Sequence, residues 1–446
     1  MSESGTISKN ITHTFIVQIP NYILGIVAGI FLTRQLGPEG KGAYTLMITN
    51  VQLLVMFLGL NLPGAIQFFT ANKKIEPSRL TGLAFLLLFA GAALVFVFLF
   101  LIPVGGESLL TKDYDTFFFR TYLFISFFVT NFNALITGFL QGNFRFKEVN
   151  KLSLVNSVLN FIIFTSMYYA AHHNFIKAGL QEVLILTLAV LGINTLILLF
   201  FFKKHLKIKW ALTISMDDIR PLVIFLIPAY ISVLVNFFNY RLTIWLVNYY
   251  EGTEGLGYFS LALNFAQMML MVTLAINTVL FPYFASKTDM QSAIKDFSFA
   301  LKINMSIMFS ATIGLILLSS FLIPLFYGEI FNPAVAPVQI LAVGTFFCSQ
   351  AQVFGHFLGA RNKNWVNTFI YGTALVCLAV LGLILVPKYG IEGAAMASGA
   401  SYFVMFSIFC IFVKVKFKVS LLSLFIITKA EIQRAKNILF RVLKKN

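Results

Sequence analysis

The sequence predicts an all-α polytopic membrane protein, with about twelve transmembrane helices in two parallel six-helix repeats. Three features lead to this fold class: long apolar runs, phrases that recur in the same order, and an uneven distribution of Lys and Arg. Among the 446 residues, 59% are hydrophobic and only 11% are charged. This composition excludes the two or three soluble domains that the length alone suggests.

The apolar runs are long enough to cross a hydrocarbon core of about 30 Å as helices, and the links between them are too short to fold as domains. The first six predicted spans cover residues 8–34, 43–69, 80–102, 116–140, 149–171 and 180–202. The second six cover residues 219–248, 257–284, 298–323, 335–359, 365–386 and 391–413. We therefore expect an N-terminal lobe at 1–202, a cytoplasmic linker at 203–218, a C-terminal lobe at 219–416 and a basic cytoplasmic tail at 417–446.

The tail mixes apolar residues with Lys and Arg, which favours an amphipathic helix on the membrane surface over a thirteenth span. Most of the Lys and Arg behind the net charge of +16 fall in the termini and the even-numbered links. By the positive-inside rule, these regions and both termini are expected in the cytoplasm. The charge therefore indicates membrane topology, and we expect no nucleic-acid partner.

Four phrases recur roughly 210 to 220 residues further along the chain. The pairs are "IPNYI" with "IPAYI", "RQLGPEGKGAYTL" with "EGTEGLGYFSL", "LIPVGGE" with "LIPLFYGE", and "FLQGNFRFKEVN" with "FLGARNKNWVN". Each match is weak alone, and chance recurrence in so apolar a chain is the open alternative. Their common order indicates a duplicated six-helix unit whose copies enter from the same side, an arrangement typical of transporters.

Arg241 is the most informative polar residue, because it lies ten residues before Glu251 and hence about 15 Å below the outer surface. An unpaired Arg at such a depth costs at least about 2.5 to 3.5 kcal/mol. It is expected to bind an anion in a wet cavity, with a structural contact to helix carbonyls as the alternative. No Asp or Glu in the sequence lies at a comparable depth.

Neutral polar side chains accompany this arginine within the predicted spans. Asn236 and Asn239 precede it at helical spacing, and Gln18 and Asn21 form the corresponding pair in the first span. We assign these four amides to a substrate cavity, although contacts between helices explain such residues equally well. Gly25 and Gly29 form a GxxxG pattern that predicts close helix packing in the same span.

Further arginines lie nearer the predicted membrane surfaces. Arg120, about one and a half turns into the fourth span, is a second candidate for the cavity or a side chain that reaches the outer interface. Arg145 and Arg361 occupy nearly equivalent places in the last repeated phrase, at the cytoplasmic ends of two spans. They are candidates for a basic rim that attracts phosphate, and the positive-inside rule alone also accounts for them.

Motifs for hydrolysis, metal binding or nucleotide binding are not found, so we expect no catalytic residues, cofactor or metal. The three cysteines lie in apolar spans without a CxxC spacing, which indicates neither a disulfide framework nor a metal site.

Arg34 with "LGPEGKGAY", then "EGLGYFSLA" after the seventh span and "YGIEGAAMASG" before the twelfth, resemble the polysaccharide-repeat flippases, including the O-antigen type. That family belongs to the multidrug/oligosaccharidyl-lipid/polysaccharide exporter superfamily, and the resemblance covers nearly the whole chain. It implies a V-shaped, two-lobed bundle with a central cationic cavity. Thr243 stands where the family often has an acidic residue, which leaves Arg241 without a counter-charge nearby on its helix.

The resemblance implies a non-enzymatic flippase that moves undecaprenyl-pyrophosphate-linked oligosaccharide units from the inner to the outer leaflet of a bacterial cytoplasmic membrane. The implied partners are the lipid-linked substrate and the bilayer, with polysaccharide polymerase and chain-length machinery as further candidates. One competing hypothesis is a cation-coupled multidrug exporter of the same fold, which is expected to carry deep carboxylates. Another is a glycan polymerase or ligase, which needs catalytic groups on a long outer loop.

Overall fold

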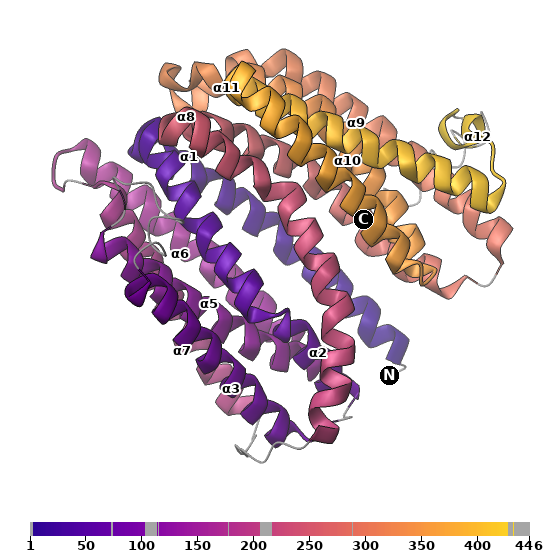
Figure 1. Cartoon of the computed structure of the whole chain (residues 1–446), viewed down its shortest axis with the longest axis horizontal. Helices are drawn as coiled ribbons and strands as arrows, with labels where there is room; N and C mark the ends of the chain where they lie inside the picture. Colours follow the sequence, from indigo (N-terminus) through magenta and orange to yellow (C-terminus); the bar gives the residue numbers. More distant parts are fainter. Residues whose placement is uncertain are drawn as a thin grey trace. The chain divides into compact units, whose positions relative to one another are not determined.

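A computed structural model describes residues 3–72, 75–102, 114, 116–176, 178–205, 216–287, 289–426 and 431. Within these ranges the regular structure is entirely helical (Figure 1). Nine helices in the described ranges are long and apolar enough to cross a membrane. The predicted all-α membrane fold is therefore confirmed at the level of its elements.

Three helices are long enough for two crossings of about 30 Å, and each contains a glycine with non-helical backbone angles. These helices are α1 (Glu3–Gly59), α8 (Met216–Ser286) and α11 (Asn364–Phe417). Their kinks lie at Gly37 (φ 64°, ψ −176°), Gly252 (φ 68°, ψ −171°) and Gly390 (φ 56°, ψ −134°). Glycine tolerates these positive φ angles because it lacks a Cβ. Since each kinked helix supplies two of the predicted spans, the nine helices provide the twelve crossings.

The other elements follow the predicted order. In the first half they are α2 (Leu62–Asn72), α3 (Pro77–Phe96), the π-helical turn η1 (Val97–Leu101), α5 (Phe117–Gly142), α6 (Phe146–His172) and α7 (Leu180–His205). In the second half they are α9 (Met290–Tyr327), the 3₁₀ turn η3 (Glu329–Ala334), α10 (Val335–Ala360) and α12 (Leu421–Phe425). Local chemistry starts several of them: Asp289, for example, caps α9 by accepting from the backbone N–H groups of Gln291 and Ser292 at 3.2 and 2.9 Å.

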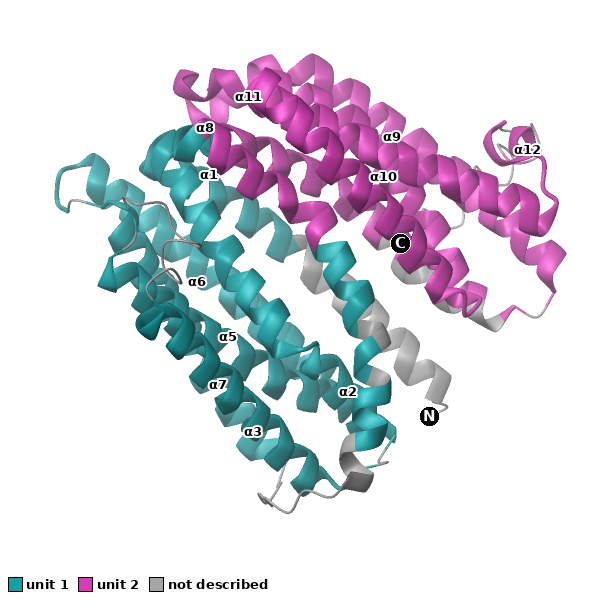
Figure 2. Ribbon diagram, viewed as in Figure 1, with its two compact units in different colours: residues 1–237, 252–257 teal, residues 238–251, 258–446 magenta. Residues whose placement is uncertain are grey.

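The chain divides into two compact units (Figure 2). Unit 1 comprises residues 1–237 and 252–257, and unit 2 comprises residues 238–251 and 258–446. In unit 1, α1 packs against α6, and α5 packs against α2 and α7. In unit 2, α10 packs against both α9 and α11. The first part of α8 thus groups with unit 1, whereas the predicted lobe boundaries assign it to the second half; much of the predicted linker, residues 206–215, lies outside the described residues.

The two copies of the glycine-rich phrase pack against each other through equivalent residues of unit 1. A side chain on Gly42 would overlap the carbonyl oxygen of Thr253, and a side chain on Gly257 would overlap the carbonyl oxygen of Pro38. Gly42 and Gly257 occupy the same place in the phrase, as do Pro38 and Thr253. The contact is therefore reciprocal, as expected where duplicated segments meet about a two-fold axis. By contrast, no described atom lies within 4 Å of a Cβ built on Gly25 or Gly29, so the predicted GxxxG contact is not observed among the described residues.

The described part of the C-terminal segment is fixed to the start of α9. Ser298 donates to the carbonyl of Ser423 at 3.0 Å, and the Lys302 ammonium donates to the Glu431 carboxylate at 2.7 and 2.9 Å. Lys302 is only 4% exposed, and a buried ammonium requires such a partner. The predicted tail helix, however, falls largely in residues 427–430 and 432–446, which lie outside the described residues.

Candidate functional site

Arg241 lies in α8, in the part that belongs to unit 2, and its side chain is partly buried. Helical geometry over the ten residues to Glu251 places it about 15 Å from the kinked end of the helix. Among the described residues, no carboxylate and no hydrogen-bond acceptor contacts its guanidinium. An arginine at this depth without a counter-charge is a candidate ligand for an anion.

Two tyrosines lie near the arginine in unit 2, Tyr240 on the same helix and Tyr402 on α11. The Tyr402 hydroxyl is within electrostatic range of the Arg241 guanidinium. The Tyr240 ring lies 6.3 Å from the Tyr402 ring, and the Tyr240 hydroxyl accepts a hydrogen bond from Gln352 at 3.2 Å. One cation and two tyrosines thus lie in the same region of unit 2. These groups suit an anionic group that carries a hydroxyl-rich substituent.

The two amides that precede Arg241 have different surroundings. Asn239 is 4% exposed and donates from Nδ2 to the backbone carbonyl of Tyr371 at 2.9 Å, which ties α8 to α11. Asn236 is exposed and lies one turn earlier, in the part of α8 that belongs to unit 1. Asn239 thus has at least one structural contact, while Asn236 is accessible for a ligand.

Unit 1 contains a row of neutral polar groups at membrane depth. Asn21 on α1 donates to the Ser153 hydroxyl on α6 at 2.9 Å. One turn further along α6, the Asn156 side-chain oxygen accepts from Asn160 at 3.1 Å and from Asn194 on α7 at 2.8 Å. The side-chain oxygens of Asn21 and Asn194 are buried and have no hydrogen-bond partner among the described residues. The row therefore contains two acceptors whose hydrogen-bonding capacity the described residues do not satisfy.

Of the two amides predicted in the first span, only Asn21 can be placed. The Gln18 backbone lies in α1, but its side chain is outside the described residues. Sequence reasoning missed Ser153, Asn194 and Tyr402 as neighbours of the candidate residues. Each is a polar residue inside an apolar helix, and this signal could have identified them as it identified the other candidates. Their partners, however, lie on other helices, and a sequence pattern does not show which helices meet.

Arg120, on α5 in unit 1, has a backbone contact in the structure. It donates from Nη1 to the carbonyl of Leu99 in η1 at 2.8 Å. In a π-helical turn the backbone hydrogen bonds join residues five apart, so some carbonyls lose the partner that an α-helix would give them. The Arg120 guanidinium donates to one such carbonyl, that of Leu99. Since Arg120 and Arg241 belong to different units, their joint action on one anion stays a prediction.

Arg145 and Arg361 both lie at turns that end a helix, and the two turns have the same geometry. Phe144 (φ 59°) and Asn362 (φ 58°) both adopt left-handed backbone angles, and the following N–H groups, of Arg145 and Lys363, each bond at 2.9 Å to a leucine carbonyl five residues earlier. The structural counterpart of Arg145 is therefore Lys363, two residues beyond Arg361.

The surroundings of the two rim arginines differ. Arg145 is exposed at the start of α6. Arg361 donates from Nη1 to the carbonyl of Lys287 at 2.7 Å, while its Nε and Nη2 atoms are buried without a hydrogen-bond partner among the described residues. These two nitrogens form one edge of the guanidinium fork, which matches a phosphate or carboxylate.

The sequence profile of a family described as "Polysaccharide biosynthesis protein" matches residues 7–288, more than half of the chain. The chain belongs to this family. Among its relatives, capsular polysaccharide biosynthesis protein CapF of Staphylococcus aureus is 22% identical over 89% of this chain and 96% of its own length. A putative O-antigen transporter of Shigella flexneri is 23% identical over 88% of this chain and 93% of its own length.

Solved structures resemble the fold of this family member. An inward-facing multidrug resistance transporter of the MATE family, in the MOP superfamily, matches with a TM-score of 0.70 and 14% identity, over 89% of this chain and 94% of that one. The lipid II flippase MurJ, in an inward closed conformation, matches with a TM-score of 0.67 and 16% identity, over 92% of this chain and 91% of that one. At these identities the likeness establishes the two-lobed, twelve-helix transporter fold.

Proposed function

We propose that this protein is a flippase that moves undecaprenyl-pyrophosphate-linked oligosaccharide repeat units from the inner to the outer leaflet of a bacterial cytoplasmic membrane. It supplies the synthesis of O antigen, capsule or exopolysaccharide. The observation that carries the proposal is Arg241, a partly buried cation at membrane depth that no described carboxylate neutralises. Membership in the polysaccharide biosynthesis family supports the substrate class, and the O-antigen transporter among the relatives supports a transport function.

In this proposal each unit supplies a different kind of contact. Arg241 binds the pyrophosphate, because guanidinium hydrogen bonds to phosphate oxygens are charge-assisted. The tyrosines beside it offer ring faces and hydroxyls to the first sugar. The amide row of unit 1 binds sugar hydroxyls. Arg145 and Arg361 attract the substrate at the cytoplasmic side. Arg145 is exposed, and the Nε and Nη2 atoms of Arg361 have no hydrogen-bond partner among the described residues.

The duplicated architecture supports alternating access as the mechanism, in which a transporter exposes its substrate site to one side of the membrane and then to the other. A cation-coupled drug exporter of the same fold is less well supported. Such an exporter needs deep carboxylates for a cationic drug, and none of the buried residues in the described ranges is Asp or Glu.

The decisive experiment replaces Arg241 in cells whose own flippase has been deleted. We expect Arg241→Ala to reduce export of repeat units at least about 100-fold, the loss that about 3 kcal/mol of charge-assisted binding implies. Arg241→Lys keeps the positive charge but cannot donate two parallel hydrogen bonds as a guanidinium does, so it should restore part of the export. Protein levels are measured in parallel by immunoblotting.

Arg79→Ala is the matched control, because the Arg79 side chain is 43% exposed and pairs with Glu76 of the same helix end at 3.5 Å. It should export normally. Normal export by the Arg241→Ala protein at normal abundance would remove the central claim. Drug resistance conferred by the overexpressed wild type, without glycan export, would favour the exporter instead.

A further inference from the structure

Lys302 places a positive charge inside unit 2. It lies in α9, about 18 Å along the helix from Met290, and is only 4% exposed. Its ammonium donates to both carboxylate oxygens of Glu431, at 2.7 and 2.9 Å, and no other carboxylate in the described ranges pairs with it. A buried ammonium depends on such a partner, because it has lost its contact with water. The position of α9 is therefore coupled to a residue 129 positions further along the chain.

The segment that follows α11 packs into unit 2 as well. Helix α12 packs against α9, and its Leu424 is fully buried in the main apolar core of this unit (Figure 1). The Phe425 ring lies 5.8 Å from the Phe406 ring of α11. We call residues 418–426 together with Glu431 the C-terminal strap. Its apolar side chains join α9 to α11.

Two polar contacts connect α9 with the strap along one face of the helix. Ser298 and Lys302 are four residues apart, so their side chains lie on the same face. Ser298 donates to the backbone carbonyl of Ser423 at 3.0 Å, and Lys302 pairs with Glu431. A hydroxyl group can be satisfied by many acceptors, whereas the buried charge requires an anion. The ion pair is therefore the more demanding of the two contacts.

The equivalent place in unit 1 contains no charge. The repeated phrases "LIPVGGE" and "LIPLFYGE" align Thr81 of α3 with Lys302 of α9. Thr81 is fully buried, and its hydroxyl donates to the carbonyl of Pro77 on its own helix at 2.7 Å. None of the buried residues described in α3 is charged. Unit 1 thus packs the corresponding helix without an ion pair at this position.

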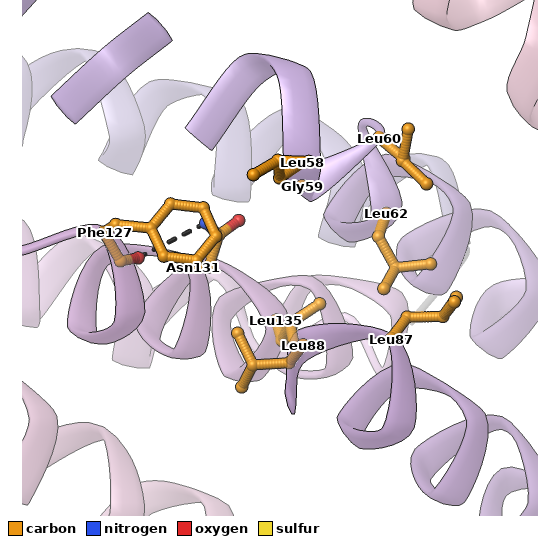
Figure 3. Close-up of a pocket in the computed structure, with 9 residues that line it drawn as sticks. All are labelled: Leu58, Gly59, Leu60, Leu62, Leu87, Leu88, Phe127, Asn131 and Leu135. Carbon is orange, nitrogen blue, oxygen red and sulfur yellow. Dashed lines mark hydrogen bonds between the residues drawn. The ribbon is translucent and has the colours of Figure 1, made fainter. Parts of the chain in front are cut away.

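Further along α3, the contacts are apolar. Helix α1 ends at Gly59 and α2 begins at Leu62, and between them Leu60 (φ 49°) and Asn61 (φ 52°) adopt left-handed backbone angles. Leu87 of α3 lines a small, mostly apolar gap beside this break (Figure 3). Apolar packing and a self-bonded hydroxyl are therefore sufficient to hold α3 in unit 1.

We propose that the C-terminal strap is a conformational lock on α9, closed by the ion pair between Lys302 and Glu431. Since unit 1 packs the equivalent helix without a charge, packing alone does not require Lys302. The charge makes the position of α9 depend on the strap, because α9 stays in place only while Glu431 neutralises the ammonium. The strap and roughly the first four turns of α9 therefore open and close as one unit.

Hydrogen–deuterium exchange of the purified full chain in nanodiscs tests the lock. Exchange is read by mass spectrometry in peptides that cover residues 290–303 and 420–426, and peptides from α5 serve as the reference in unit 1. In the wild type both regions should be protected. Exchange of residues 420–426 as fast as in an unstructured peptide would overturn the proposal. This measurement needs no variant, so a misfolded variant cannot hide the result.

Three variants replace the charged groups by an apolar side chain of similar length. Glu431→Met leaves the buried ammonium unpaired, so exchange in both regions should rise at least about tenfold while α5 stays unchanged. Lys302→Met leaves a carboxylate whose side chain is 22% exposed and accessible to water, so its effect should be smaller. The double variant removes both charges and should return exchange to within about threefold of the wild type.

Glu392→Met is the matched control, because Glu392 is an exposed carboxylate on α11. It should exchange as the wild type does. Wild-type exchange in the Glu431→Met protein, or no recovery in the double variant, would show that the ion pair is not the lock. An equal rise in α5 would show general destabilisation in place of a local opening, and would also contradict the proposal. None of these measurements depends on export, so they test the lock separately from the proposed function.

Discussion

At the scale of single residues, the candidate site groups of the two units differ in chemistry. Unit 2 holds the charged group, Arg241, together with tyrosine hydroxyls. Unit 1 holds the row of amides on α1, α6 and α7, centred on Asn156. Within a membrane these amides stabilise helix contacts by about 0.6–2 kcal/mol each, so a structural role and a binding role must be separated by experiment.

Replacement of Asn156 separates the two roles. Asn156→Ala removes the acceptor of two hydrogen bonds and leaves the amide of Asn194 unsatisfied, so we expect both a lower melting temperature and less export. The double variant Asn156→Leu with Asn194→Leu removes both partners and should recover most of the melting temperature while export stays impaired. Ser166→Ala, at an exposed position of the same helix, is the control. Full export by the stable double variant would assign the row to structure alone.

At the scale of elements, glycines decide where helices bend and how closely they approach. Gly37 and Gly252 have nearly the same backbone angles, and the phrases that contain them pack on each other by way of Gly42 and Gly257. Gly29 precedes the first kink within α1 and has no described neighbour at its Cβ position. Glycines in one helix thus have different roles, and only the structure distinguishes them.

A pair of substitutions tests this distinction. Gly42→Ala should destabilise the protein by several kcal/mol, because its methyl group would meet the backbone of Thr253, which cannot move aside as a side chain can. Gly29→Ala should be neutral or stabilising by about 0.5–1 kcal/mol, since alanine favours a helix. The measurement is thermal unfolding in detergent. Equal melting temperatures for the two variants would show that the close contact contributes nothing.

The elements were predictable from the sequence because their signals are local. Span lengths follow from apolar runs, and the kinks at Gly37 and Gly252 coincide with repeated phrases. The contacts of the candidate site were not predictable, because Asn21 meets Ser153 across 132 residues and Asn156 meets Asn194 across 38. Likewise, Pro63 was visible in the sequence, but the left-handed angles of Leu60 and Asn61 depend on how the surrounding helices accommodate it.

At the scale of the whole molecule, the duplication and the charge distribution jointly define a direction across the membrane. An even number of spans in each half places the ends of both halves on one side. By the positive-inside rule, the Lys and Arg of the termini and even-numbered links predict that this side is the cytoplasm, since basic residues are retained there during insertion. We therefore expect the glycine kinks on the outer side and the turns at Arg145 and Arg361 on the inner side. The proposed direction of transport depends on it.

Reporter fusions test this orientation directly. A fluorescent protein that matures only in the cytoplasm should be bright when fused to either terminus or inserted after Lys204, and dark when inserted near Asn174. Alkaline phosphatase, which is active only outside, should give the opposite pattern at the same four positions. The inverse result at all four positions would reverse the inferred sides of Arg145 and of the kink at Gly37, and would exclude the cytoplasmic rim. A mixed pattern within one half would instead contradict the even number of crossings on which the parallel repeat depends.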